Sequence, residues 1–190
     1  MGGNYKGGCQ CGAVRYEVLG RPHVIWACHC TICQRQSGSA FGMAVVFQDA
    51  KIDIEGTEPA HFVRAGRGQS ARCYFCRQCG TRIYHQWFND QGDIPYLNLK
   101  PGTLDDTSWL RPGCHMWTQH AQPGVTFAPD DVIFKQQPRP EEVPLYDGPY
   151  FYWPIMSWSF ASFRCPAAIR SLPGRSGRRA SGTIGGLGRE

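Results

Sequence analysis

Hydrophobic and polar positions alternate over much of the first hundred residues, a pattern typical of half-buried β-strands. In residues 12–18, for example, Val14, Tyr16 and Val18 fall on one face. We expect further strands in similar runs that Gly and Pro separate: residues 42–47, 51–54, 60–64, 81–87 and 96–99. No window follows the 3.6-residue period of an amphipathic helix, and the helix that we expect is short, from Thr31 to Gln36. The sequence thus predicts a mainly β fold of small curved sheets, with a turn, or knuckle, at each cysteine cluster.

The C-terminal part of the chain differs in composition from the rest. Residues 139–148 are rich in Pro and Glu and predict a linker. Residues 149–163 are crowded with aromatic side chains, and the residues that follow are rich in Arg, Ser and Gly, which is typical of disorder. We therefore expect one domain over residues 1–138, a linker, and a poorly ordered aromatic and then basic tail over residues 149–190. Because the tail fits no folding pattern, a non-native origin such as a shifted reading frame is an alternative.

The charge is unevenly distributed along the chain. The 190 residues carry a formal net charge of +5. Residues 1–149 hold 4 Lys and 10 Arg against 9 Asp and 5 Glu, whereas residues 150–190 hold 6 Arg and one Glu. The main domain is thus neutral and lacks the basic patch of a nucleic-acid-binding domain, so any binding of nucleic acid would depend on the tail.

The location follows from apolar runs and cysteine usage. No run of 18 apolar residues occurs, so we expect no membrane-spanning helix. The first residues lack the apolar region of a secretory signal. We therefore expect a cytoplasmic protein, in which the 10 cysteines stay reduced and bind metal rather than form disulfides.

One set of cysteines has the spacing of a four-sulfur zinc site. Cys76 and Cys79 are separated by two residues, so both sulfurs can reach one ion. A left-handed conformation of the following Gly80 would let backbone N–H groups face the thiolates. Cys9 and Cys11 form a second pair that would complete a tetrahedral site. The alternative is four buried cysteines without metal.

The triplet of Cys28, Cys30 and Cys33 supplies only three ligands, which leaves a fourth tetrahedral position. A catalytic zinc site keeps that position for water or substrate, whereas a protein ligand would make the site structural. The candidates for such a ligand are Cys73, His29, His85 and His115. Cys73 is the main alternative ligand, because it raises the number of clustered cysteines to eight. A buried cysteine within a strand is the other interpretation of Cys73.

The charge of the triplet indicates its chemistry. Three thiolates and one zinc ion sum to one negative charge, so this centre is a weaker Lewis acid than zinc held by neutral histidines. It suits a soft fourth ligand such as a thiol, and a zinc-bound thiol is held as the nucleophilic thiolate. The spacing therefore favours thiol capture and transfer over hydrolysis.

Several segments together resemble a known family. They are residues 7–16 (GGCQCGAVRY), 28–41 (CHCTICQRQSGSAF), 75–81 (FCRQCGT) and 102–106 (GTLDD), with weaker matches at residues 112–117 and 130–134. The ordered cysteine groups in these segments, which span about residues 3–138, resemble the glutathione-dependent formaldehyde-activating enzymes and the centromere-protein-V-like domains.

The resemblance implies a β-rich fold like that of the Mss4 group and two zinc ions per chain. It implies a structural zinc on Cys9, Cys11, Cys76 and Cys79, and a catalytic zinc on Cys28, Cys30 and Cys33. It further implies a carbon–sulfur lyase that joins glutathione, a small thiol, to the aldehyde formaldehyde and gives S-hydroxymethylglutathione.

Three residues outside the cysteine groups are candidates for contact with substrate. Arg35 lies just after the triplet and would steady the alkoxide, although a solvated surface arginine is the alternative. His115 and Trp117 would line the substrate site, and a core histidine is the alternative for His115. The competing hypothesis for the whole chain is a zinc-stabilised binding module without catalysis, in which both zinc sites are structural.

Overall fold

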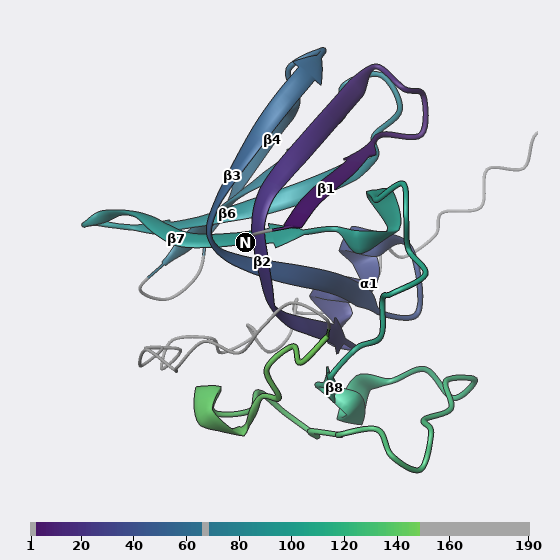
Figure 1. The fold of residues 1–190 in the computed structure, drawn as a ribbon. Helices are drawn as coiled ribbons and strands as arrows, with labels where there is room; N and C mark the ends of the chain where they lie inside the picture. Colours follow the sequence, from purple (N-terminus) through teal and green to yellow (C-terminus); the bar gives the residue numbers. More distant parts are fainter. Residues whose placement is uncertain (1–2, 66–68, 149–190) are drawn as a thin grey trace, which may run out of the picture.

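The structure is a computed structural model that describes residues 3–65 and 69–148. The strands within these ranges are β1 (Gly3–Gly8), β2 (Val14–Cys28), β3 (Gly42–Gly56), β4 (Ala60–Arg64), β5 (Ser70–Phe75), β6 (Arg82–Asn89), β7 (Gly92–Leu99) and β8 (Cys114–Met116) (Figure 1). The helix α1 spans Thr31–Ser37, and the 3₁₀ turns are η1 (Pro101–Thr103), η2 (Thr118–His120) and η3 (Pro140–Glu142). The prediction of a mainly β protein with a curved sheet is confirmed.

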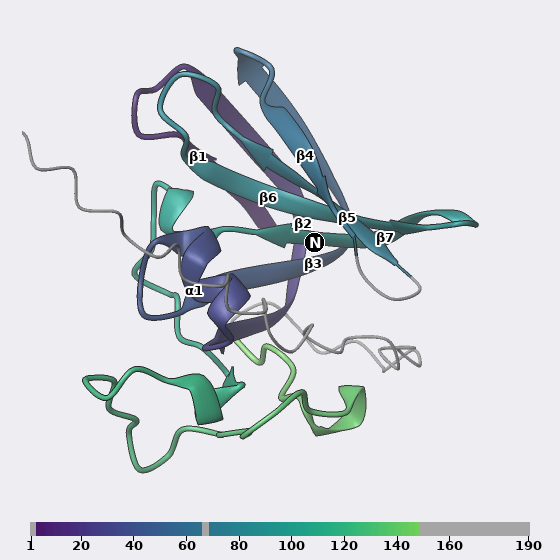
Figure 2. The ribbon, with the colours of Figure 1, turned by 180° about the vertical axis from the view of Figure 1, so that it is seen from behind.

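The strands form a single curved sheet. Its order is β1-β2-β3-β7-β6-β5-β4, with antiparallel neighbours throughout, and β8 pairs with β2 in parallel. β2 and β3 have 15 residues each, and their pairing shifts register between Leu19 and Arg21 and again between Pro22 and Val24. Such bulges bend a strand and increase its twist, so the sheet curls over on itself (Figures 1 and 2).

Three features of the strands differ from the sequence-based expectation. The strand predicted at residues 12–18 continues to Cys28 as β2. The predicted strands 42–47 and 51–54 are one continuous strand, β3. Asp49 lies between them with a positive φ of 50°, so the polar residues there bend the strand and do not end it. β1 and β8 were not predicted, because β1 is rich in glycine and β8 has only 3 residues.

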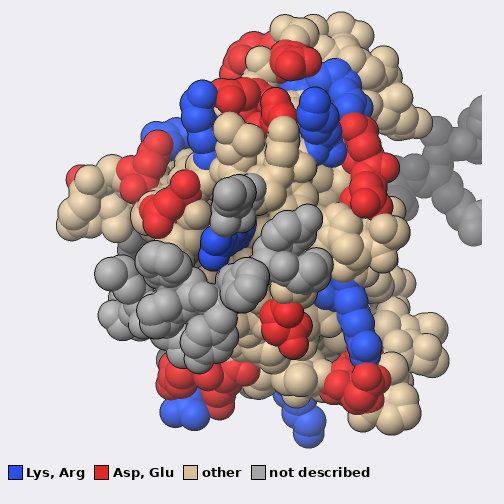
Figure 3. Space-filling model, in the orientation of Figure 1, with Lys and Arg blue, Asp and Glu red and all other residues tan. Residues whose placement is uncertain are grey.

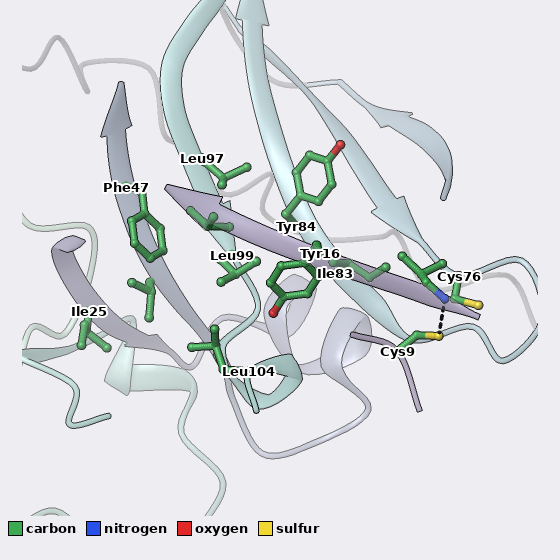
Figure 4. Close-up of a cluster of buried hydrophobic side chains, with 13 residues drawn as sticks. Cys9, Tyr16, Ile25, Phe47, Cys76, Ile83, Tyr84, Leu97, Leu99 and Leu104 are labelled. Atoms are coloured by element: carbon green, nitrogen blue, oxygen red, sulfur yellow. Dashed lines mark hydrogen bonds between the residues drawn. The ribbon is translucent and has the colours of Figure 1, made fainter. Parts of the chain in front are cut away.

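The inner face of the curved sheet holds the main hydrophobic core (Figure 4). Val14, Tyr16 and Val18 of β2 are buried there, as their alternation predicts. They pack with Phe47 of β3 and with apolar side chains of β6 and β7. The core therefore joins the two ends of the sheet across its curved interior.

The opposite face, which we call the outer face, carries buried polar groups. Phe62, Cys73, His85 and Asn98 stand in register across β4, β5, β6 and β7, so they share this face. The helix α1 lies over the same face, because the side chain of Gln36 is 3.0 Å from His85 Nε2. His85 and Asn98 are buried although both are polar.

The chain after η1 packs against the lower end of β2 in Figure 1. Residues 139–148, which the sequence predicts as a linker, contain η3, and Tyr146 donates its backbone N–H to the carbonyl of His23 in β2 at 2.9 Å. The predicted tail, residues 149–190, lies outside the described residues. Within the described ranges, no helix has the length and apolar character needed to cross a bilayer.

Replacing Phe47 with Ala is expected to lower the free energy of unfolding by about 3–5 kcal/mol, because loss of a buried ring leaves a cavity. Urea denaturation followed by circular dichroism measures the change. The control is Val132→Ala, at a side chain that is 39% exposed, with an expected change within about 0.5 kcal/mol. Equal losses in the two variants would contradict the central position of Phe47 in the core.

Candidate metal centres

The first candidate centre is a group of four cysteines that we call the tetrad: Cys9, Cys11, Cys76 and Cys79. Their Sγ atoms all lie within 4.8 Å of one another. One pair follows β1 and the other follows β5, so the curl of the sheet brings together residues that are 65 positions apart. The structure thus assembles the four cysteines that the spacing selects.

Each knuckle of the tetrad turns through a left-handed glycine, as the sequence predicts for Gly80. Gly12 has φ 78° and Gly80 has φ 73°. The N–H of Gly80 donates to the carbonyl of Cys76 at 2.9 Å. In the other knuckle the N–H of Val14 donates to the Cys9 sulfur at 3.2 Å, the dashed line in Figure 4. In both knuckles, a left-handed glycine follows the second cysteine of the pair.

The tetrad fits a zinc ion. In a tetrahedral site with zinc–sulfur bonds of about 2.3 Å, the sulfurs are about 3.8 Å apart. The Sγ atoms of Cys9 and Cys11 lie 3.5 Å apart, and those of Cys11 and Cys76 lie 3.8 Å apart. Hydrogen bonds from Thr81 lower the pKa of Cys79 to about 5, so this cysteine favours the thiolate that a metal requires, whereas the neighbouring thiols, Cys9 first among them, raise the pKa of Cys11 to about 12.

The second candidate centre is the triplet of Cys28, Cys30 and Cys33. Cys28 ends β2, Cys30 is the N-cap of α1, and Cys33 lies in the first turn of that helix. Their Sγ atoms also lie within 4.8 Å of one another. Hydrogen bonds from the thiols of Cys28 and Cys33 lower the pKa of Cys30 to about 2. Apolar side chains, among them Trp26 and Met116, pack around the triplet.

No fourth His, Cys, Asp or Glu from the described part of the chain joins the triplet. Cys73, the main alternative ligand, is fully buried in β5 and belongs to neither group of sulfurs. His85 is opposite Cys73 in the sheet, and its Nε2 lies 3.0 Å from both Gln36 Nε2 and Arg82 Nη2. Both of these groups can only donate, so His85 Nε2 accepts and is not free to bind a metal.

His29 and His115 bond to each other rather than to the triplet. His29 Nε2 lies 3.1 Å from His115 Nδ1, and His115 Nε2 lies 3.6 Å from a carboxylate oxygen of Asp131. Burial lowers the pKa of both histidines. His29 lies between Cys28 and Cys30 and is completely buried, so its bond to His115 fixes the backbone between these two cysteines.

The structure places the other predicted substrate contacts, Arg35 and Trp117, in different surroundings. Arg35 is exposed on α1, and residues two apart on a helix do not face each other, so Arg35 points away from Cys33. Trp117 packs at the edge of the apolar group around the triplet, where its indole N–H donates to the side-chain oxygen of Gln137 at 3.2 Å. Trp117 is therefore a structural neighbour of the triplet.

Sequence analysis missed a group of cations on the outer face, Arg64, Arg82 and Lys100, which we call the basic cluster. Burial lowers the pKa of Lys100 to about 8, with Arg82 and Arg64 adding to the effect and the Cys33 thiol opposing it. The backbone N–H of Lys100 donates to the carbonyl of Ile83, the neighbour of Arg82 in β6, at 2.7 Å. The three residues are far apart in sequence, and no local pattern distinguishes them from surface charges.

Among the described residues, the face drawn in Figure 3 shows no large gathering of one charge. On the face drawn in Figure 3, acidic and basic side chains are interspersed. This distribution agrees with the neutral composition of residues 1–149.

The fold and the two cysteine groups define a class: a mainly β protein with two groups of cysteines that could hold metal ions. The family model named glutathione-dependent formaldehyde-activating enzyme matches residues 4–120. The chain belongs to this family, and the sequence-based assignment is confirmed.

The relatives are distant. A Halomonas elongata protein, which its name assigns to the glutathione-dependent formaldehyde-activating enzymes, is 27% identical over 84 residues, or 42% of this chain and 54% of that protein. The chain thus matches about half the length of this curated relative. A crystal structure of a Rhodobacter sphaeroides protein, a structural genomics target, aligns with 68% of this chain and 98% of its own, at 19% identity and a TM-score of 0.40.

The left-handed conformation of Gly80 predicts that adding a methyl group there lowers the stability of the protein. Gly80→Ala should lower the free energy of unfolding of the metal-loaded protein by about 1–2 kcal/mol, because an L side chain is strained at this φ although no atom lies within 4 Å of the new Cβ. Thermal unfolding measures the effect. Gly124→Ala is the matched control, since Gly124 also has open space around a new Cβ but no positive φ. An equal response of both variants would argue against a backbone constraint at Gly80.

Proposed function

We propose that the protein is a zinc-dependent carbon–sulfur lyase that adds the thiol of glutathione to formaldehyde and releases S-hydroxymethylglutathione. The observation that carries the proposal is the triplet, whose three clustered sulfurs have no fourth protein ligand among the described residues. Membership of the family supports the same activity.

The two centres take different roles in this proposal. The tetrad holds a structural zinc with four sulfurs, and the triplet holds a second zinc with one position left for substrate. Zinc at the triplet would supply the charge that keeps a substrate thiol as its nucleophilic thiolate. The chain thus binds two zinc ions.

The protein's own residues orient the reactants. Cys28, Cys30 and Cys33 fix one open direction, because β2 and α1 hold their sulfurs on a rigid corner of the fold. The apolar side chains around the triplet limit the access of water. In the reaction the thiol loses its proton, a carbon–sulfur bond forms, and the aldehyde oxygen takes up a proton to become the hydroxyl group of the product.

Catalysis is tested by mixing the zinc-loaded protein with glutathione and formaldehyde and following the adduct by exchange NMR. The expected result is an exchange rate that increases in proportion to protein concentration. Cys30→Ser protein at the same concentration is the control. A rate equal to that of the uncatalysed reaction would refute the formaldehyde activity.

The two centres should respond differently to substitution. Cys30→Ser should remove activity and one zinc ion per chain but leave most of the fold, because serine also caps a helix N-terminus. Cys76→Ser should unfold most of the domain, because structural zinc contributes about 10–16 kcal/mol in small peptides, comparable with the stability of a whole domain.

Zinc analysis and circular dichroism read out both variants, and Cys73→Ser is the control, with two zinc ions per chain and activity retained. Equal collapse of the Cys30 and Cys76 variants, or four protein sulfurs on both ions in X-ray absorption, would instead favour a binding module with two structural sites.

A further inference from the structure

Three cations lie on the outer face near Phe62 and Asn98. The Arg82 guanidinium lies over the Phe62 ring, Arg64 is two positions from Phe62 on β4, and Lys100 is two positions from Asn98. Arg64 ends β4, Arg82 begins β6, and Lys100 follows β7. Arg82 and Arg64 both disfavour the charged form of Lys100, which burial disfavours first. Burial lowers the pKa of Arg82, and Arg64 adds to this effect, although the Cys73 thiol opposes it. The fold thus concentrates positive charge where like charges repel.

No carboxylate in the described part of the chain compensates this charge. The ion pairs among the described residues include none of the three cations. The Nε atom of Arg82 is buried and has no hydrogen-bond partner there. A buried cationic donor without an acceptor is costly, and an anion supplied from outside the chain would satisfy it.

The two guanidinium groups are held in place rather than left to move. Arg82 lies 4.7 Å from the ring centre of Phe62 and bonds to His85, while Arg64 lies 5.0 Å from the ring centre of Trp87. Aromatic faces attract guanidinium groups and fix their orientation. A prearranged pair of this kind loses little entropy when it binds a ligand.

The helix α1, which carries Cys33 of the triplet, contacts the basic cluster through His85. The Cys33 thiol is among the groups that act on Lys100. Gln36, one turn further along α1 and on the same side of the helix, contacts His85. His85 in turn contacts Arg82. A continuous path of contacts therefore leads from the sulfurs to the cations.

The basic cluster carries more positive charge than a zinc-loaded triplet would neutralise. A zinc ion on three thiolates carries one net negative charge, which offsets one of the three cations. We propose that Arg64, Arg82 and Lys100 bind a carboxylate group of the substrate that reacts at the triplet, an inference that rests on the proposed function. Guanidinium groups bind carboxylates through paired hydrogen bonds, and Lys100 adds a point charge. The carboxylate belongs either to the thiol, as in glutathione, or to an acidic aldehyde such as glyoxylate.

Binding is tested without catalysis by isothermal titration of the zinc-loaded full chain. The probes are S-methylglutathione, which keeps its carboxylates but has no free thiol, and glyoxylate without any thiol. At least one probe should bind, and Arg82→Gln and Lys100→Met should each weaken it about tenfold or more, the usual loss for a hydrogen bond to a charged group. The control is Arg15→Gln, which removes an exposed guanidinium paired with Asp105 and should leave binding unchanged.

Steady-state kinetics identifies which reactant carries the carboxylate. Glyoxylate is compared with uncharged glycolaldehyde, and 3-mercaptopropionate with uncharged 2-mercaptoethanol. If the aldehyde is acidic, Lys100→Met raises KM about tenfold for glyoxylate but not for glycolaldehyde. If the thiol is acidic, the same rise is confined to 3-mercaptopropionate. In both cases kcat changes less than KM, since the cluster binds the group that does not react.

The outcomes separate this inference from the proposed function. Carboxylate binding that the cluster variants abolish, in a protein that forms no adduct, would support the binding site and refute the lyase. The inference would be overturned if no cluster substitution alters adduct formation and if the probes either do not bind or bind equally to all variants. The proposed lyase activity would then still stand. Circular dichroism verifies that each variant folds. If Arg82→Gln or Lys100→Met unfolds, Arg64→Gln, at the end of a strand, takes its place.

Discussion

The pairing of β2 is the constraint on which the rest of the structure depends. This strand begins just after the first cysteine knuckle and ends at the first sulfur of the triplet. It pairs with β1 along its first half, with β8 at its end and with β3 along its length. Because hydrogen bonds fix the strand on both sides, the tetrad and the triplet keep fixed positions in one framework. The register shifts near its middle turn that framework from a flat sheet into a curved one.

The curvature gives the two faces of the sheet different physical roles. The inner face is filled by apolar side chains that supply the stability of the fold. The outer face buries His85 and Asn98 and gathers Arg64, Arg82 and Lys100, which repel one another. Such groups destabilise a protein in the absence of partners. Sites that break the rules of stability in this way are typical of functional surfaces.

The sequence predicts the cysteine groups and most strands because both signals are local. The two-residue spacing of Cys76 and Cys79 is enough to predict a knuckle. The alternation of Val14, Tyr16 and Val18 predicts the buried face of a strand. The same reasoning misses β1 because glycines carry no side-chain pattern, and it divides β3 at Asp49 because one bent residue resembles a turn.

Local sequence patterns do not predict which distant residues come into contact. Spacing leaves four candidates for the fourth position of the triplet, with Cys73 as the main one beside His29, His85 and His115. Only the sheet register reveals that His85 accepts from Arg82 and that His29 bonds to His115. The basic cluster is invisible in the sequence for the same reason, since three strands must align before its members meet.

The length of β2 also has a consequence for which thiols can meet while the chain is being synthesised. Cys9, Cys11 and the triplet leave the ribosome before Cys76 and Cys79, so five thiols are available before the tetrad can be completed. A single ion shared between the first knuckle and the triplet would trap the nascent chain in a wrong arrangement. Fifteen residues of extended strand span about 50 Å if straight. Once β2 pairs with β3, it keeps Cys9 and Cys11 apart from the triplet until Cys76 and Cys79 complete the tetrad.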